Sequence, residues 1–164
     1  MVQVRWEGFG GDPAHLQGLL DRLLGEAEGR AALLLDSAGR LLTMAGDAPR
    51  FDLDTFVSLM AADFCATREL ARMLGEEQFH SVAHQGEDLS LYLTQATPGT
   101  ILALVHDRST TLGLVRYAVQ RALPALARAI QSGLDAWEAE ARPLAEGFGE
   151  EALERIDRLF DSRI

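Results

Sequence analysis

Residues 31–44 read AALLLDSAGRLLTM, and this stretch decides the fold class of the chain. The run 31–35 is apolar at every position, as expected for a strand that is covered on both faces. Residues 36–39 have the composition of a tight turn, because Asp accepts hydrogen bonds from nearby backbone N–H groups and Gly tolerates a positive φ. Residues 40–44 then return as a second strand. The stretch therefore predicts a β-hairpin whose first strand is buried.

Three further strands are predicted downstream. Residues 78–85 and 88–95 flank a polar turn, and leucines alternate with polar residues in the second of these segments. After a Thr-Pro-Gly turn, residues 101–105 are again apolar at every position. We expect strands 31–35 and 101–105 inside the sheet and the more polar strands 40–44 and 78–85 at its edges.

Helical patterns separate these strands. Asp12-Pro13 predicts the start of a helix over 13–28, with Asp as N-cap and Pro at the first helical position. A second helix is expected over 53–74, capped by Asp52 or Asp54, and a third over 111–133. Pro124 should kink or break the third helix, because proline cannot donate a backbone hydrogen bond.

The C-terminal part is predicted to be a separate unit. Arg142-Pro143 and residues 147–149 (GFG) indicate a linker, and residues 150–162 then have the pattern of an amphipathic helix. The chain thus divides into an N-terminal lead-in over 1–12, a domain over 13–133 and a helical C-terminal extension over 134–164.

Composition excludes several classes of function. With 25 acidic and 15 basic residues among 164, the net charge is −10, which disfavours nucleic acid and anionic membranes as partners. No apolar run is long enough to insert into a membrane. Cys65 is the single cysteine, so no internal disulfide can form and we expect a reducing, cytoplasmic location.

The side chains suggest no catalytic site. All 15 basic residues are arginine, so the lysine of a Walker-type phosphate loop and any Schiff-base lysine are missing. His106, Asp107 and Ser109 are residue types used by hydrolases, but such close neighbours cannot align as base, orienting group and nucleophile. Cys65, in the middle of a helix, has the character of a small apolar residue. We therefore expect no enzyme and no cofactor.

His80 and His84 lie at even spacing on one predicted strand, so both should point to one face. A zinc site needs further ligands, and neither Cys65 nor His106 is suitably spaced to provide one. We expect two edge-strand histidines at a surface or subunit contact, and no metal site. Protonation there could make an interface sensitive to pH.

One flank of the second helix begins with the small residues Ser58, Ala61, Ala62 and Cys65. A solvent face normally carries long polar side chains, so small ones suggest that a second backbone packs closely against this flank. The alternative is that alanine is present because it favours the helix.

Several of these stretches together resemble the Roadblock family of dynein light-chain-like proteins. The similarity rests on residues 32–40 (ALLLDSAGR), the small-residue helix 57–74, and residues 101–107 followed by 112–116 (LGLVR). Residues 74–79 (LGEEQF) and 84–87 (HQGE) are similar to MglB-type members, the partners of the Ras-like GTPase MglA. The resemblance covers about residues 13–133.

The resemblance implies an α/β fold of the α+β type. A five-stranded antiparallel sheet in the order 2-1-5-4-3 would carry two helices on one face and one on the other, plus the C-terminal helix. It also implies a homodimer in which the third strands of two copies pair edge to edge, which would cover an exposed sheet edge. The implied dimer interface consists of Phe79, His80, Ser81, Val82, Ala83 and His84.

The resemblance further implies that the dimer binds a Ras-like small GTPase in the control of polarity or motility. It would stimulate GTP hydrolysis without a catalytic residue, by stabilising the arrangement in which the GTPase's own arginine and glutamine face the nucleotide. The C-terminal helix could contact the GTPase or pack on its own dimer. The implied GTPase-binding residues are Ala61, Cys65, Arg68, Glu69 and Arg72.

Two alternatives remain. A Roadblock scaffold would dock proteins without changing GTP turnover. A small-ligand sensor would need a roomy, partly polar cavity, whereas the densely aliphatic strands predict a filled core.

Overall fold

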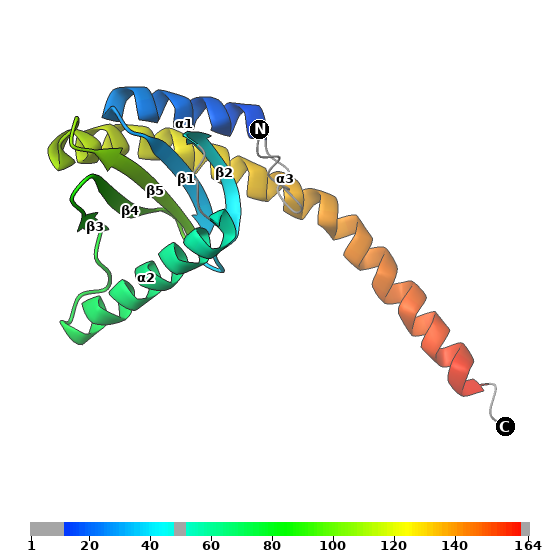
Figure 1. Ribbon diagram of the computed structural model, residues 1–164. Coiled ribbons are helices and arrows are strands. Elements are labelled where there is room, and N and C mark those ends of the chain that lie inside the picture. The colour runs from blue at the N-terminus through cyan, green and yellow to red at the C-terminus, as the bar shows by residue number, and fades with distance from the viewer. Residues whose placement is uncertain (1–11, 48–51, 162–164) are drawn as a thin grey trace.

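The computed structural model describes residues 12–47 and 52–161, with side chains as far as Ala136. One antiparallel sheet lies between two layers of helix (Figure 1). The elements in chain order are α1 (Pro13–Ala27), β1 (Ala31–Asp36), β2 (Leu41–Gly46), α2 (Leu53–Met73), β3 (Ser81–Gln85), β4 (Leu89–Thr97), β5 (Thr100–Asp107) and α3 (Leu112–Asp161).

The β1–β2 hairpin forms for the reasons that its sequence indicated. Asp36 Oδ1 accepts hydrogen bonds from the backbone N–H groups of Ala38 and Arg40 at 3.0 and 2.9 Å. Gly39 has a φ of +79°, a conformation that residues with a Cβ rarely adopt. A Cβ at Gly39 would also lie 2.9 Å from the Cα of Ser58 on α2. The turn therefore needs glycine both for its backbone and for its close approach to α2.

The strand order is β2-β1-β5-β4-β3, which confirms the expected order 2-1-5-4-3. β1 pairs with both β2 and β5, and β5 pairs with both β1 and β4. The two strands with continuous apolar runs are thus inner strands, as predicted from their polarity, and β4 is the third inner strand. β2 and β3 form the edges.

The two faces of the sheet bury two separate apolar clusters. Leu34, Leu102 and Leu104 point towards α1 and the first part of α3. Leu33 and Ile101, one residue away along their strands, point towards α2. Because side chains alternate along a strand, β1, β2, β4 and β5 each contribute to both clusters, whereas β3 contributes Val82 to the α2 side alone. Two helices on one face and one on the other confirms the expected layering (Figure 1).

Aspartate side chains cap two of the helices. Asp12 accepts a hydrogen bond from Ala14 N at 2.9 Å at the start of α1. Asp52 accepts hydrogen bonds from the backbone N–H groups of Asp54 and Thr55 at the start of α2. Both caps satisfy backbone donors that a helix leaves free at its N-terminus.

The predicted break at Pro124 and the predicted linker around 142–149 are both wrong. α3 is one continuous helix over 50 residues, so neither Pro124 nor the expected linker around 142–149 interrupts it. Pro124 is exposed on the helix surface, where the loss of one hydrogen bond is tolerated. Alanine, leucine and glutamate are frequent around Pro143, and their helix propensity outweighs that of single proline and glycine residues.

The second half of α3 projects away from the domain (Figure 1). The side chains of residues 150–162, for which an amphipathic pattern is predicted, lie outside the described residues. Of the predicted lead-in over 1–12, only Asp12 is described. Among the described residues, no helix combines the length and the apolar character that crossing a bilayer requires.

Candidate partner-binding surface

The outer face of α2 carries exposed apolar side chains. Leu59, Leu70 and Met73 are 63%, 56% and 83% exposed. Ala62 and Ala66 lie between them at helical spacing and are also exposed. We call these five residues the outer stripe of α2. Exposed apolar groups gathered on one face of a helix mark an interaction surface more often than scattered ones do.

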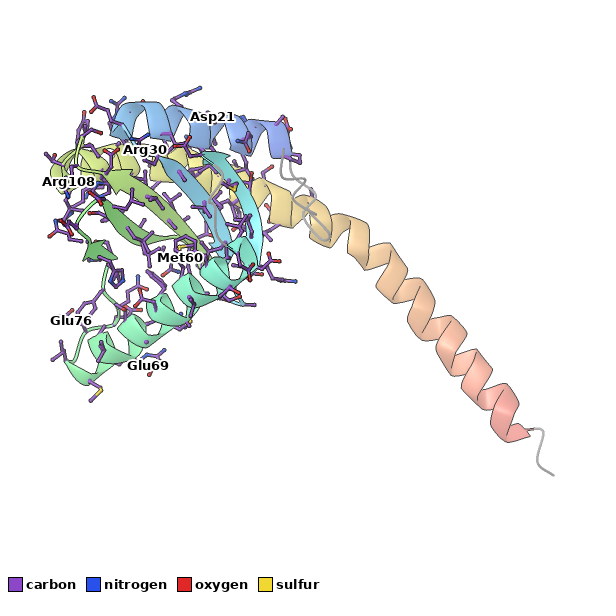
Figure 2. The ribbon with its side chains drawn as sticks, viewed as in Figure 1. Asp21, Arg30, Met60, Glu69, Glu76 and Arg108 are labelled. Atoms are coloured by element: carbon purple, nitrogen blue, oxygen red, sulfur yellow. The ribbon has the colours of Figure 1, made fainter. Side chains whose placement is uncertain are left out.

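The inner face of α2 is packed on the sheet. Val57, Met60 and Phe64 are buried in the cluster that includes Leu33 and Leu93. Figure 2 shows Met60 between α2 and the sheet, with Glu69 on the side of the helix away from the sheet. The helix therefore has two apolar faces, of which one is buried within the chain.

The five residues implied as GTPase-binding do not form one surface. Ala61 is 3% exposed and packs against the sheet, which corrects the expectation that it faces a partner. Cys65 and Arg68 are half-buried. Glu69 and Arg72 are exposed and form an ion pair, with Arg72 Nη1 2.6 Å from Glu69 Oε1.

Arg68 differs from the other two charged residues of this flank. Its Nε is buried and has no hydrogen-bond partner among the described residues. A buried donor without an acceptor costs free energy.

The outer stripe was not predicted from the sequence. Spacing of three and four residues between Leu59, Ala62, Ala66, Leu70 and Met73 was the available signal. It was obscured because α2 carries two apolar stripes, and spacing alone does not say which of them covers the sheet. Leu74, the last residue of the predicted helix 53–74, is 73% exposed just beyond the end of α2.

One sheet edge lies beside α2. β3 pairs only with β4 in the described chain, so its other side is an open edge. Of the six residues implied for the dimer interface, Ser81, Val82, Ala83 and His84 lie in β3. Phe79 and His80 precede the strand, which begins later than the predicted residue 78. The reason is the α2–β3 connection, in which Gly75 with a φ of +84° turns the chain.

A side-chain contact joins this edge to α2. His84 Nε2 lies 2.7 Å from Asp63 Oδ2, and the two side chains are 52% and 38% exposed. Asp63 is on the flank of α2 opposite Cys65 and Arg72. The open edge of β3 is therefore on the Asp63 side of the helix, and the implied GTPase-binding flank is on the other side.

The hydrolase-type residues at the end of β5 do not form a catalytic arrangement. Ser109 donates its hydroxyl and its backbone N–H to Asp107, and Arg30 Nη2 lies 2.6 Å from the same carboxylate. These contacts, the Ser109 hydroxyl above all, hold the pKa of Asp107 well below its ordinary value. His106 is buried, with Nδ1 3.2 Å from the Asp107 carbonyl oxygen. The group ties the end of β5 to the α1–β1 connection.

Arg108 reinforces the same end of the sheet. It donates to the carbonyl of Glu87 and to Asp88 Oδ1, which links the β5–α3 turn to the β3–β4 turn. Arg30 and Arg108 are both labelled at this end in Figure 2. Within the described residues, no group of three His, Cys, Asp or Glu side chains is placed to hold a metal ion.

Solved structures with this fold include several MglB proteins. Myxococcus xanthus MglB is 30% identical, covers 74% of this chain and 98% of its own, and has a TM-score of 0.70. The gliding protein MglB from Thermus thermophilus is 37% identical, covers 73% of this chain and 90% of its own, and has a TM-score of 0.67. An MglB with a tetrameric arrangement is also 37% identical, with coverage of 74% and 91% and a TM-score of 0.69.

A comparison with curated proteins gives no match. The sequence model of the Roadblock/LC7 domain matches residues 16–106, from α1 through β5. Because that match spans more than half of the chain and the MglB structures agree with it over most of their own length, the protein is a member of the Roadblock/LC7 family.

Proposed function

We propose that two copies of this chain form a homodimer that binds a Ras-like small GTPase of the MglA type and stimulates its GTP hydrolysis. The observation that carries the proposal is the combination of an open β3 edge with an exposed apolar stripe on the neighbouring α2. The similarity to MglB proteins supports the choice of partner.

The hydrogen bonding of β3 supports edge-to-edge pairing. Gly86 N donates to Leu89 O at 3.0 Å, so these two residues form a hydrogen-bonded pair. Since such pairs alternate in an antiparallel ladder, the backbone groups of Ser81, Ala83 and Gln85 point away from β4. They are free to pair with the same strand of a second copy, as an open edge tends to do.

The outer stripe supports a helix contact in the same dimer. α2 lies on one face of the sheet beside the β3 edge, so pairing of two β3 strands would place two α2 helices next to each other. Leu59, Leu70 and Met73 would then be removed from water, at roughly 25 cal/mol for each Å² of apolar surface. The small Ala62 and Ala66 would let the two helices approach closely.

The remaining flank of α2 would face the GTPase. Cys65 offers a small, half-buried contact, and Arg68 offers the half-exposed part of its side chain. Glu69 and Arg72 supply exposed charges that could exchange their mutual ion pair for contacts with the partner. Ala61 packs between α2 and the sheet, beneath this surface, and is not part of it.

The proposed mechanism is a shift of population. A dimer that binds the hydrolysis-competent conformation of the GTPase more tightly than its other conformations raises the fraction of that conformation. The GTPase supplies the reacting groups, and the dimer supplies only differential affinity.

Phosphate release tests this proposal. The full chain would be titrated into a purified Ras-like GTPase of the MglA type, with GTP in excess. We expect faster hydrolysis that saturates at a fixed stoichiometry. Binding without acceleration would instead support a scaffold, and absence of binding would contradict the proposed partner.

Cys65→Arg places a long charge on the proposed GTPase-binding flank and should abolish acceleration while the dimer persists. Gln120→Arg is the matched control, because Gln120 is exposed on α3 at the opposite layer. Equal loss in both variants would contradict the assignment of the flank.

A further inference from the structure

We propose that the paired β3 edges form a site for a divalent transition-metal cation of the zinc type, with His84 of one copy and a histidine of the second copy as ligands. The inference rests on the proposed homodimer and adds a ligand to it. Neither copy holds the site alone, since the described part of one chain brings no three His, Cys, Asp or Glu side chains together.

One ring nitrogen of His84 is already held by a carboxylate, which leaves the other nitrogen for a metal. Its Nε2 is 2.7 Å from Asp63 Oδ2, and about half of the side chain is exposed. A carboxylate bound to one ring nitrogen fixes the tautomer, so that Nε2 carries the proton and Nδ1 keeps its lone pair. Histidines that bind zinc commonly donate their other ring N–H to a carboxylate in this way.

His84 lies on the α2 side of the sheet. Val82 pairs with Leu93 and packs in the cluster under α2, and His84 is two residues further along β3. His80 is two residues before Val82, and its carbonyl accepts a hydrogen bond from Thr94 Oγ1 at 2.8 Å, which directs the backbone towards β4. His80 itself precedes β3, at a bend of the chain.

The hydrogen bonds of β3 decide which residues face each other across a dimer. Backbone groups of Ser81, Ala83 and Gln85 point outwards. A two-fold antiparallel pairing must join these outward groups to each other, so odd-numbered residues pair with odd-numbered residues. Even-numbered residues then oppose even-numbered ones, in non-hydrogen-bonded pairs whose Cα atoms are about 4.5 Å apart.

Registers with a two-fold axis between residues 81 and 84 bring the backbone of a histidine of the second copy near His84. A two-fold axis at Val82 sets His84 opposite His80 of the second copy, and an axis at His84 sets the two His84 side chains opposite each other. An axis at Ser81 or Ala83 leaves His80 of the second copy as a diagonal neighbour, about 7–8 Å away. A bridging cation can span either separation, because the two imidazoles coordinate from opposite sides.

The chemistry favours a zinc-like cation. Imidazole suits zinc, copper and nickel, whereas magnesium and calcium prefer oxygen ligands. Two imidazoles leave coordination positions for water, so the site would link the two copies without enclosing the metal. A net charge of −10 for each chain and the adjacent Asp63 both favour a cation at this edge.

Sedimentation equilibrium of the untagged full chain, freed of metal with a chelator, tests the site. Addition of Zn²⁺ should lower the dissociation constant of the dimer at least about tenfold, by binding the dimer in preference to the monomer. Mg²⁺ should have no such effect. His84→Ala should remove the response to Zn²⁺, and His15→Ala, an exposed histidine on α1, should leave it unchanged.

Asp63→Asn tests the orienting contact separately. Calorimetric titration should show Zn²⁺ affinity reduced roughly 10- to 100-fold, as for other carboxylates that support a metal-bound histidine. The far-ultraviolet circular dichroism of this variant and of His84→Ala should match the parent, since both side chains are exposed.

The outcomes separate the two proposals. A dimer that forms in chelator and ignores Zn²⁺ overturns the metal site and leaves the proposed function standing. A chain that stays monomeric with and without Zn²⁺ overturns both. A response to Zn²⁺ that survives in His84→Ala overturns the assignment to the β3 edge.

Discussion

The two faces of the sheet are completed to different degrees. Beneath α1 and α3, Leu34, Leu102 and Leu104 are fully buried by two helices of the same chain. On the other face, α2 buries its inner side but exposes Leu59, Leu70 and Met73 on its outer side. The first face is a core that one chain can form alone. The second leaves apolar side chains of α2 exposed to solvent, so we expect changes there to affect association more than folding.

The largest effect should come from the completed face. Leu104→Ala removes a buried side chain beneath α1 and α3 and should lower the free energy of unfolding by about 2–5 kcal/mol. Urea denaturation measures this loss. Leu59→Ala on the outer stripe is the comparison and should cost less than about 1 kcal/mol in the monomer. Similar losses in both variants would remove the distinction between the two faces.

The next effect concerns association. Leu70→Glu places a charge in the outer stripe and should weaken the dimer at least about 100-fold, because burying an unpaired carboxylate is costly. Sedimentation equilibrium measures it. Tyr117→Glu on α3 is a matched control, since Tyr117 is 57% exposed and Leu70 is 56% exposed. If Tyr117→Glu weakened the dimer and Leu70→Glu did not, the dimer would form through α3 and not through α2.

A smaller effect should appear at acid pH, at the end of the sheet where Arg30 and Ser109 hold Asp107. The pKa of Asp107 is lowered in the folded chain, so its contribution to stability is present above the ordinary carboxyl pKa of about 3.9. It is lost as the pH falls towards the lowered native pKa. Thermal unfolding between pH 6 and pH 3 should therefore show a smaller decline in Asp107→Asn than in the parent. Identical slopes would contradict the depressed pKa.

The smallest effect on folding should come from the charged flank of α2. Glu69→Gln breaks an exposed ion pair with Arg72 and should change the free energy of unfolding by less than about 0.5 kcal/mol. If Glu69 contacts the GTPase, stimulation of hydrolysis should fall more than this stability change explains. Unchanged stimulation would remove Glu69 from the binding surface.

The strands were predictable because the local sequence pattern of apolar residues indicates which strands are buried. The apolar runs at 31–35 and 101–105 indicated two of the three inner strands, and the Asp36 turn carries the hydrogen bonds that its composition suggested. The full strand order needed the family resemblance, because pairing between distant strands leaves no local signature.

The surface of α2 was harder to predict. Ala61 looked like part of an exposed small-residue flank, and only its contact with the sheet shows that it is buried. Ser58 did meet a second backbone, that of the β1–β2 turn at Gly39. The length of α3 was missed because single proline and glycine residues were given more weight than the helix formers around them.

The 50-residue α3 affects how the protein would behave in solution. At 1.5 Å per residue this rod is about 75 Å long, and much of it protrudes from a small domain (Figure 1). Such a shape raises hydrodynamic friction, so gel filtration should overstate the mass of the particle. Light scattering, which reports mass independently of shape, is the better way to distinguish one chain from two.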